Sequence, residues 1–101
     1  MKEQQRVSEF LEDHQLEAPP EFRLLDLVSE LGEVAKNATE STDYGDDPKQ
    51  LAIEADEIGD VLFSLLAVAD SLDIDASKAL DTSLAKYTER IEEKDNPGSG
   101  K

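Results

Sequence analysis

ADEIGDVLFSLLAVADSL, which spans residues 55–72, contains the longest apolar run of the chain and sets its fold class. Its apolar residues recur every three or four positions, which is the period of an α-helix. They occupy nearly all sides of that helix, so we expect it to be covered from several directions. The run is too short to span a bilayer. The segment therefore predicts the central helix of a small helical domain.

Working outward, this helix is expected to begin before residue 55. The sequence from Asp47 to Gln50, DPKQ, is typical of an N-cap, a first-turn proline and a capping-box glutamine, so the helix is predicted from Asp47 to about Leu72. Its main apolar stripe comprises Leu51, Ala55, Ile58, Leu62, Leu65, Ala69 and Leu72. A second apolar face comprises Ile53, Phe63, Ala67 and Val68. Because the rest of a small chain can hardly cover that second face, it predicts contact with a partner subunit.

Three more helices are expected around this one. They are predicted at Glu3–Gln15, at Pro20–Glu40 and from Asp75, as N-cap, to about Lys94. Gly and Pro stand between these segments, and the alternation typical of strands is absent. The chain is therefore predicted to be all-α, a four-helix bundle-like domain over residues 1–94 with a short N-terminal helix. Residues 95–101 have nothing to bury and are predicted to be a flexible, disordered tail.

Composition excludes several classes of function. The 101 residues include 25 acidic and 10 basic side chains, which gives a formal net charge of −15. Such a chain repels the phosphates of nucleic acids and anionic membrane surfaces, so neither is an expected partner. The lack of cysteine excludes disulfides and thiolate zinc sites, and His14 is the only histidine. With no apolar signal segment near Met1, we expect a cytoplasmic protein. Its acidic composition indicates either adaptation to a high-salt cytosol or an acidic protein of an ordinary cytosol.

Two acidic pairs stand out at the margins of the apolar stripes. Glu30 and Glu33 are three residues apart on the second predicted helix, and Glu57 and Asp60 have the same spacing on the third. Two carboxylates about 4 Å apart repel by about 4 kcal/mol at an effective dielectric constant near 20. No Lys or Arg lies one helical turn from Glu57 or Asp60. The pairs are therefore either solvated faces or ligands of a hard cation such as Mg²⁺, which prefers oxygen.

Two motifs with this spacing resemble those of a known family. The segments SELGE at 29–33 and EIGDVLF at 57–63 resemble the Glu-x-x-Glu and Glu-x-x-Asp motifs of the MazG-like nucleotide pyrophosphohydrolases, which are all-α nucleoside triphosphate pyrophosphatases. The segment KYTER at 86–90 resembles the Lys-aromatic-x-x-Arg stretch of their last core helix. The resemblance covers about Phe22 to Ile91. It departs from the family at Ser29, where a second Glu is common, and at Leu84, where Asn is frequent.

The resemblance implies a set of site residues. The ligands of Mg²⁺, or of Mn²⁺ in its place, and the catalytic residues would be Glu30, Glu33, Glu57 and Asp60. Lys86 and Arg90 would contact the triphosphate or form structural ion pairs. Base recognition is implied near the start of the second helix, at Phe22. Tyr44 follows that helix, where a tyrosine either stacks on a base or packs locally.

The implied activity is hydrolysis of a nucleoside triphosphate between its α and β phosphates, which releases a nucleoside monophosphate and pyrophosphate. The family also implies a homodimer or homotetramer with sites near subunit boundaries. Three alternatives remain open at this point. They are a phosphoribosyl-ATP pyrophosphohydrolase-like activity, a non-catalytic helical adaptor or antitoxin-like protein, and a divalent-ion buffer.

Overall fold

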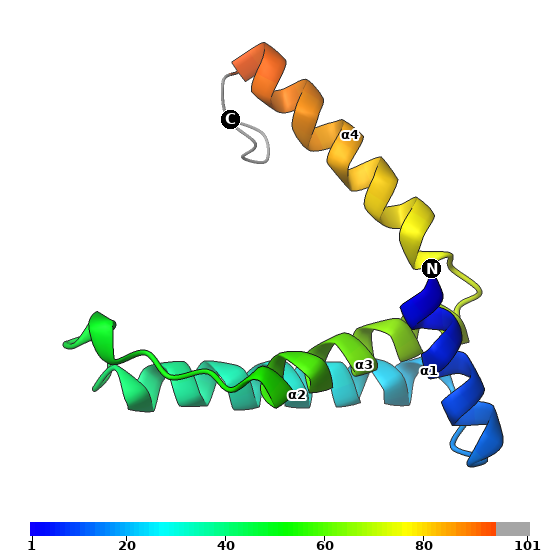
Figure 1. The fold of residues 1–101 in the computed structure, drawn as a ribbon, viewed down its shortest axis with the longest axis horizontal. Coiled ribbons are helices and arrows are strands. Elements are labelled where there is room, and N and C mark those ends of the chain that lie inside the picture. Colours follow the sequence, from blue (N-terminus) through cyan, green and yellow to red (C-terminus); the bar gives the residue numbers. More distant parts are fainter. Residues whose placement is uncertain (95–101) are drawn as a thin grey trace.

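The computed structural model describes residues 1–94, which contain four α-helices and no strand (Figure 1). The helices are α1 (Lys2–Asp13), α2 (Pro20–Ser41), α3 (Ala55–Ser71) and α4 (Ala76–Lys94), and a short 3-10 turn, η1, covers Pro48–Gln50. This arrangement confirms the predicted all-α class and its four helices. The tail predicted for residues 95–101 lies outside the described residues.

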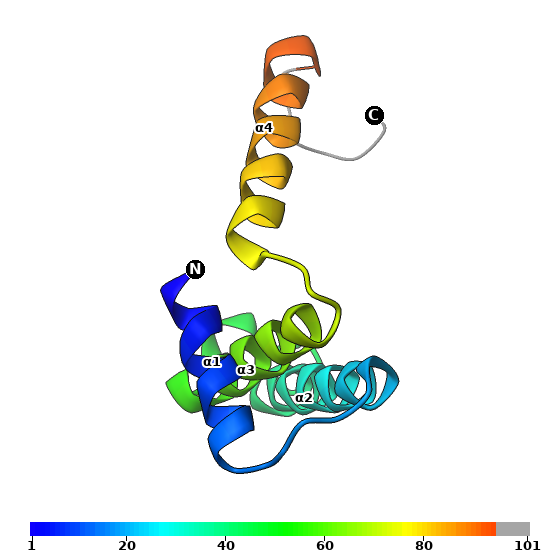
Figure 2. The same ribbon diagram turned by 90° about the vertical axis from the view of Figure 1, so that its right-hand side faces the viewer.

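Helices α2 and α3 run antiparallel, side by side, and α1 crosses α3 near its C-terminal half (Figures 1 and 2). The small apolar core lies where these helices meet, and it consists of Leu11, Leu66, Ala67 and Val68. The Phe10 and Phe63 rings meet edge to face there, with centroids 5.8 Å apart. Burial of these side chains and the aromatic contact hold α1 on α3.

The predicted start of the third helix is wrong. Asp47 and Pro48 begin only the short turn η1, and α3 starts at Ala55 after an extended residue, Glu54. A second capping box begins α3 instead, because the backbone N–H of Glu54 donates to the Glu57 carboxylate at 3.1 Å. The Ser41 hydroxyl accepts the N–H of Ala52 at 3.0 Å and holds the preceding segment against the end of α2.

The two apolar faces of α3 also differ from the prediction. The side expected to need a partner subunit carries Ala67 and Val68, and both are buried within the chain. The stripe expected to be the main core face is open instead, with Ile58, Leu62 and Leu65 each at least 44% exposed. The physical reason is that α3 packs against α2 and α1, and within residues 1–94 α4 leaves without covering the remaining stripe.

Helix α4 begins as predicted and then leaves the rest of the molecule. The Asp75 carboxylate accepts the backbone N–H groups of Ser77 at 2.9 Å and Lys78 at 3.2 Å, which confirms it as the N-cap. The hydrogen bond from the Lys78 N–H holds the pKa of the Asp75 carboxyl below its usual value. From there α4 rises away from the layer of α1, α2 and α3 (Figures 1 and 2).

Candidate active site

An acidic pocket of about 310 Å³ lies between α2 and α3. Its lining residues are Ser29, Glu30, Glu33, Val34, Asn37, Glu57 and Asp60. All four carboxylates singled out in the sequence therefore line one pocket. Two come from each helix, which is what the antiparallel pairing of two i, i+3 acidic pairs produces.

Helix geometry explains why these side chains share one pocket. Glu30, Glu33 and Asn37 are three and four residues apart, so they form one row along α2. Glu57 and Asp60 form a matching row in the first turns of α3. The Asn37 side chain continues the acidic row of α2, and the sequence analysis did not include it. The same helical spacing that selects Glu30 and Glu33 would have found it.

Glu57 is held by two hydrogen bonds from different elements. Its Oε2 atom accepts the backbone N–H of Glu54 at 3.1 Å, and its Oε1 atom accepts the Asn37 side-chain amide. The half-buried Glu57 therefore caps its own helix and is tied to α2 at the same time. Two donors on one carboxylate fix the position of the Glu57 side chain between the two helices.

The donor set of the pocket suits a hard cation. Carboxylate and amide oxygens are the ligands that Mg²⁺ prefers, and no His or Cys lies among the lining residues. Within residues 1–94, no group of three or more Asp, Glu or His side chains is arranged to hold a metal ion. The chemistry of the residues fits Mg²⁺, and binding would require the carboxylates to move closer together than they lie here. Glu57 can ligate an ion and keep both hydrogen bonds, since each of its oxygens has two lone pairs.

The two cations predicted to contact the triphosphate lie elsewhere in the chain. Lys86 and Arg90 are on α4, on either side of Tyr87, with the Lys86 Nζ atom 5.0 Å and the Arg90 Cζ atom 5.7 Å from the centre of its ring. Neither lines the acidic pocket. Neither forms an ion pair with an acidic residue of the described chain. Within one copy of the chain, the two basic side chains predicted to bind phosphate therefore lie apart from the four carboxylates of the pocket.

The two aromatic residues predicted near a base also lie outside the acidic pocket. Phe22 is in the first turn of α2, and Tyr44 follows its C-terminal end. A helix of 22 residues is about 33 Å long, so the two rings cannot contact one base within a single copy. Both side chains are exposed, Tyr44 at 76%.

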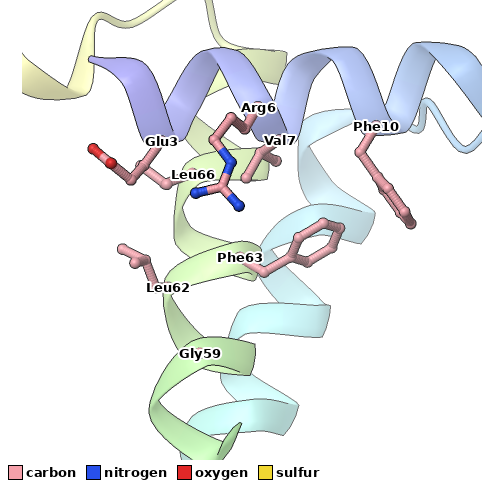
Figure 3. A pocket seen from close by; sticks show the side chains of 8 residues that line it. All are labelled: Glu3, Arg6, Val7, Phe10, Gly59, Leu62, Phe63 and Leu66. Atoms are coloured by element: carbon pink, nitrogen blue, oxygen red, sulfur yellow. The ribbon is translucent and has the colours of Figure 1, made fainter.

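A second cavity, of about 510 Å³, is lined by residues of α1 and α3 (Figure 3). Arg6 extends from α1 toward α3 across this cavity, and Phe10 and Phe63 stand beside it. Gly59 lies in its wall next to Asp60 in the chain, but Asp60 lines the acidic pocket. The first turns of α3 therefore lie between the acidic pocket and a cavity that is lined by apolar side chains together with Glu3 and Arg6.

Comparison with known proteins assigns the class of this chain. Residues 19–94 match the family described as the MazG nucleotide pyrophosphohydrolase domain. The match covers both acidic motifs and the segment from Lys86 to Arg90, and the chain belongs to this family. The resemblance stated from the sequence is confirmed.

A relative in Bacillus subtilis (strain 168), the uncharacterized protein YpjD, is 44% identical over 69 residues. The aligned part covers 63% of this chain and 60% of YpjD, so the chain matches less than two thirds of that relative. No solved structure matches this chain. Among the described residues, no helix combines the length and apolar character that a membrane crossing needs.

Proposed function

We propose that this chain hydrolyses nucleoside triphosphates between the α and β phosphates, with Mg²⁺, and releases a nucleoside monophosphate and pyrophosphate. One observation carries the proposal. The Glu-x-x-Glu and Glu-x-x-Asp motifs of a nucleotide pyrophosphohydrolase family line a single pocket from two antiparallel helices. The pocket has four carboxylates and no basic side chain in its lining. It would therefore suit a phosphate ligand that is bound together with a metal cation.

The residues proposed to hold Mg²⁺, or Mn²⁺ in its place, are Glu30, Glu33, Glu57 and Asp60. When bound, the ion would supply the positive charge that polarises phosphoryl oxygens and makes an attacking water more acidic. Asn37 would orient Glu57 through its amide hydrogen bond.

The chain's own residues supply the remaining chemistry of the proposed reaction. As the oxygen of a water molecule bonds to phosphorus, the water loses a proton and the bond between phosphorus and the bridging oxygen breaks. A carboxylate of the acidic pocket would accept that proton. Lys86 and Arg90 would bind the phosphate oxygens that the carboxylates repel, and Phe22 and Tyr44 would contact the base. No covalent enzyme intermediate is needed.

The proposed assembly is a homodimer or homotetramer. Nineteen large apolar side chains of the described residues are exposed, and only four apolar residues are buried. A chain with so little core needs further burial to reach the stability of ordinary proteins.

A pyrophosphate-release assay tests the proposal. We expect turnover of at least one nucleotide in a panel of NTPs and dNTPs with Mg²⁺ or Mn²⁺, and loss of turnover with a chelator. Asp60→Asn should lower kcat/KM more than about 100-fold, since even the residues that support metal ligands contribute about 10–100-fold. Asp56→Asn removes the same charge from an exposed position outside the pocket and should change the rate little.

The assay also separates the alternatives. Turnover of phosphoribosyl-ATP alone would replace the proposed substrate. Metal binding that nucleotide does not tighten would indicate an ion buffer. No turnover of any nucleotide with either metal would overturn the proposal and favour the non-catalytic helical adaptor.

A further inference from the structure

The cavity lined by α1 and α3, called the α1–α3 cavity below, takes no part in the proposed hydrolysis, but it has the size of a ligand site. Its volume of about 510 Å³ falls within the roughly 300–1,000 Å³ of small-molecule pockets. Most of its lining side chains are apolar, and its two charged groups both come from α1 (Figure 3). Apolar walls with a few polar groups are typical of a site for a small organic molecule.

Two phenylalanine rings give the cavity a surface that suits a flat molecule. Phe10 of α1 and Phe63 of α3 meet edge to face, with centroids 5.8 Å apart. Phe10 is still 44% exposed in spite of this contact, and so is Leu62 beside Phe63. A planar ring bound here would bury apolar surface and gain an aromatic contact. The open parts of these side chains therefore favour an aromatic ligand.

Glu3 and Arg6 give the cavity one acceptor group and one donor group. They are one turn apart on α1, and neither forms an ion pair within residues 1–94. The Arg6 side chain extends toward α3 across the cavity (Figure 3). The chain has 25 acidic side chains, so a lack of possible partners does not explain why Arg6 forms no ion pair. Since their charges cancel, the two groups together suit a ligand that has no net charge.

The hydrogen-bonding chemistry of these two groups selects the kind of ring. Arg carries only donors, and its fork of N–H groups matches two neighbouring acceptors, such as O6 and N7 of guanine. An ionised Glu carries only acceptors, which match the N1–H and 2-amino donors of the same ring. Adenine has an amino donor where guanine has O6, so it would present a donor to the Arg6 donors. The cavity thus combines the apolar, donor and acceptor groups that a guanine ring needs.

We propose that the α1–α3 cavity binds a guanine base, whose acceptors face Arg6 and whose donors face Glu3. The ring lies against Phe10 and Phe63. The cavity and the acidic pocket have no lining residue in common, so this is a second site. It is also separate from the base contacts proposed at the two ends of α2. Binding here needs neither a metal ion nor a triphosphate, and it does not depend on the proposed function.

Calorimetric titration of the full chain with nucleosides, without metal, tests the site. Guanosine should bind at one saturable site per chain, and adenosine should bind at least about tenfold more weakly. Inosine lacks only the 2-amino donor of guanosine, so its affinity should lie between the two. No saturable binding of guanosine, or equal affinity for guanosine and adenosine, would overturn the proposal.

Titration with GMP identifies the source of the base. GMP carries the same ring, but its phosphate is repelled by a chain of formal charge −15, so we expect guanosine to bind more tightly at low salt. Tighter binding of GMP would make a guanine nucleotide the ligand of the same cavity.

Variants test whether the base binds in this cavity. Arg6→Ala should weaken guanosine binding at least about tenfold. Arg6→Lys keeps the charge but loses the fork of donors, so it should weaken binding as well. Lys2→Ala is the control, since it removes the same charge from an exposed position of α1 outside the cavity. Asp60→Asn, in the acidic pocket, should keep the wild-type affinity for guanosine.

Two results would overturn the assignment of guanosine to this cavity. The first is wild-type affinity in both Arg6 variants with an unchanged urea midpoint. The second is loss of guanosine binding in Asp60→Asn, which would place the base at the acidic pocket.

Discussion

Helix α4 and the α2–α3 hairpin both carry apolar residues at helical spacing, but these residues lie in different environments in one copy of the chain. In the hairpin, Leu66, Ala67 and Val68 are buried by neighbouring helices. In α4, the whole apolar stripe from Leu80 to Ile91 is open. The hairpin is closed by its own connection, but the exit of α4 is held by a side chain of α1. An amphipathic pattern shows that a helix face needs cover, and the connection decides whether the same copy provides it.

The largest effect should come from parallel leucine-to-alanine substitutions, one in the buried core of the hairpin and one in the apolar stripe of α4. Leu66→Ala removes buried side-chain volume and should lower the free energy of unfolding by about 2–5 kcal/mol, measured by urea denaturation. Leu84→Ala should instead raise the dissociation constant of the dimer, measured by sedimentation. If Leu84→Ala left association unchanged and destabilised the chain as much as Leu66→Ala, α4 would be packed within its own copy.

A smaller effect is expected at the contact between the two hairpin helices. Asn37→Ala removes the amide that donates to Glu57, so Mn²⁺ affinity and kcat/KM should fall about 10–100-fold. Calorimetric titration with Mn²⁺ measures the first quantity. Thr39→Ala is the control, since its hydroxyl bonds only to Ala35 of its own helix. Unchanged Mn²⁺ affinity in Asn37→Ala would remove this residue from the site.

A still smaller effect on stability should come from the Gln4 clamp, the pair of hydrogen bonds from the Gln4 side chain to the Ile74 carbonyl oxygen and the Ala76 N–H. Gln4→Ala deletes two hydrogen bonds between α1 and the start of α4, at a cost of about 1 kcal/mol. It should also weaken association, because α4 is no longer held outward. Gln5→Ala is the control, as Gln5 bonds only to Glu9 of its own helix at 3.1 Å. Equal association constants for the two variants would show that the clamp does not direct α4.

The smallest effect concerns the start of α4 at acid pH. The pKa of the Asp75 carboxyl is lowered in the folded chain by the Lys78 N–H, so its ionised form stabilises α4 above the ordinary value of 3.8. That stabilisation is lost as the pH falls through the lowered pKa. Asp75→Asn keeps a good N-cap but lacks this dependence, so wild type and variant should converge in urea midpoint at low pH. Asp81→Asn, later in α4, should follow the wild-type curve.

The helices and the acidic pocket could be predicted from local patterns. Helical spacing alone placed Glu30 and Glu33 in one row and Glu57 and Asp60 in another, and both rows line one pocket. The start of α3 was missed because two capping signals compete seven residues apart, and the one at Glu54 begins the helix. The direction of α4 could not be predicted, since it depends on Gln4 and Ile74, which are 70 residues apart in the chain.

Glu57 connects the acidic pocket to the backbone that begins α3. Each carboxylate oxygen has two lone pairs, so Glu57 can ligate a cation and still accept the Glu54 N–H and the Asn37 amide. An ion in the pocket would therefore fix the first turn of α3 and its bond to α2 through the same carboxylate. Amide hydrogen exchange at the Glu54 N–H should slow when the pocket is filled.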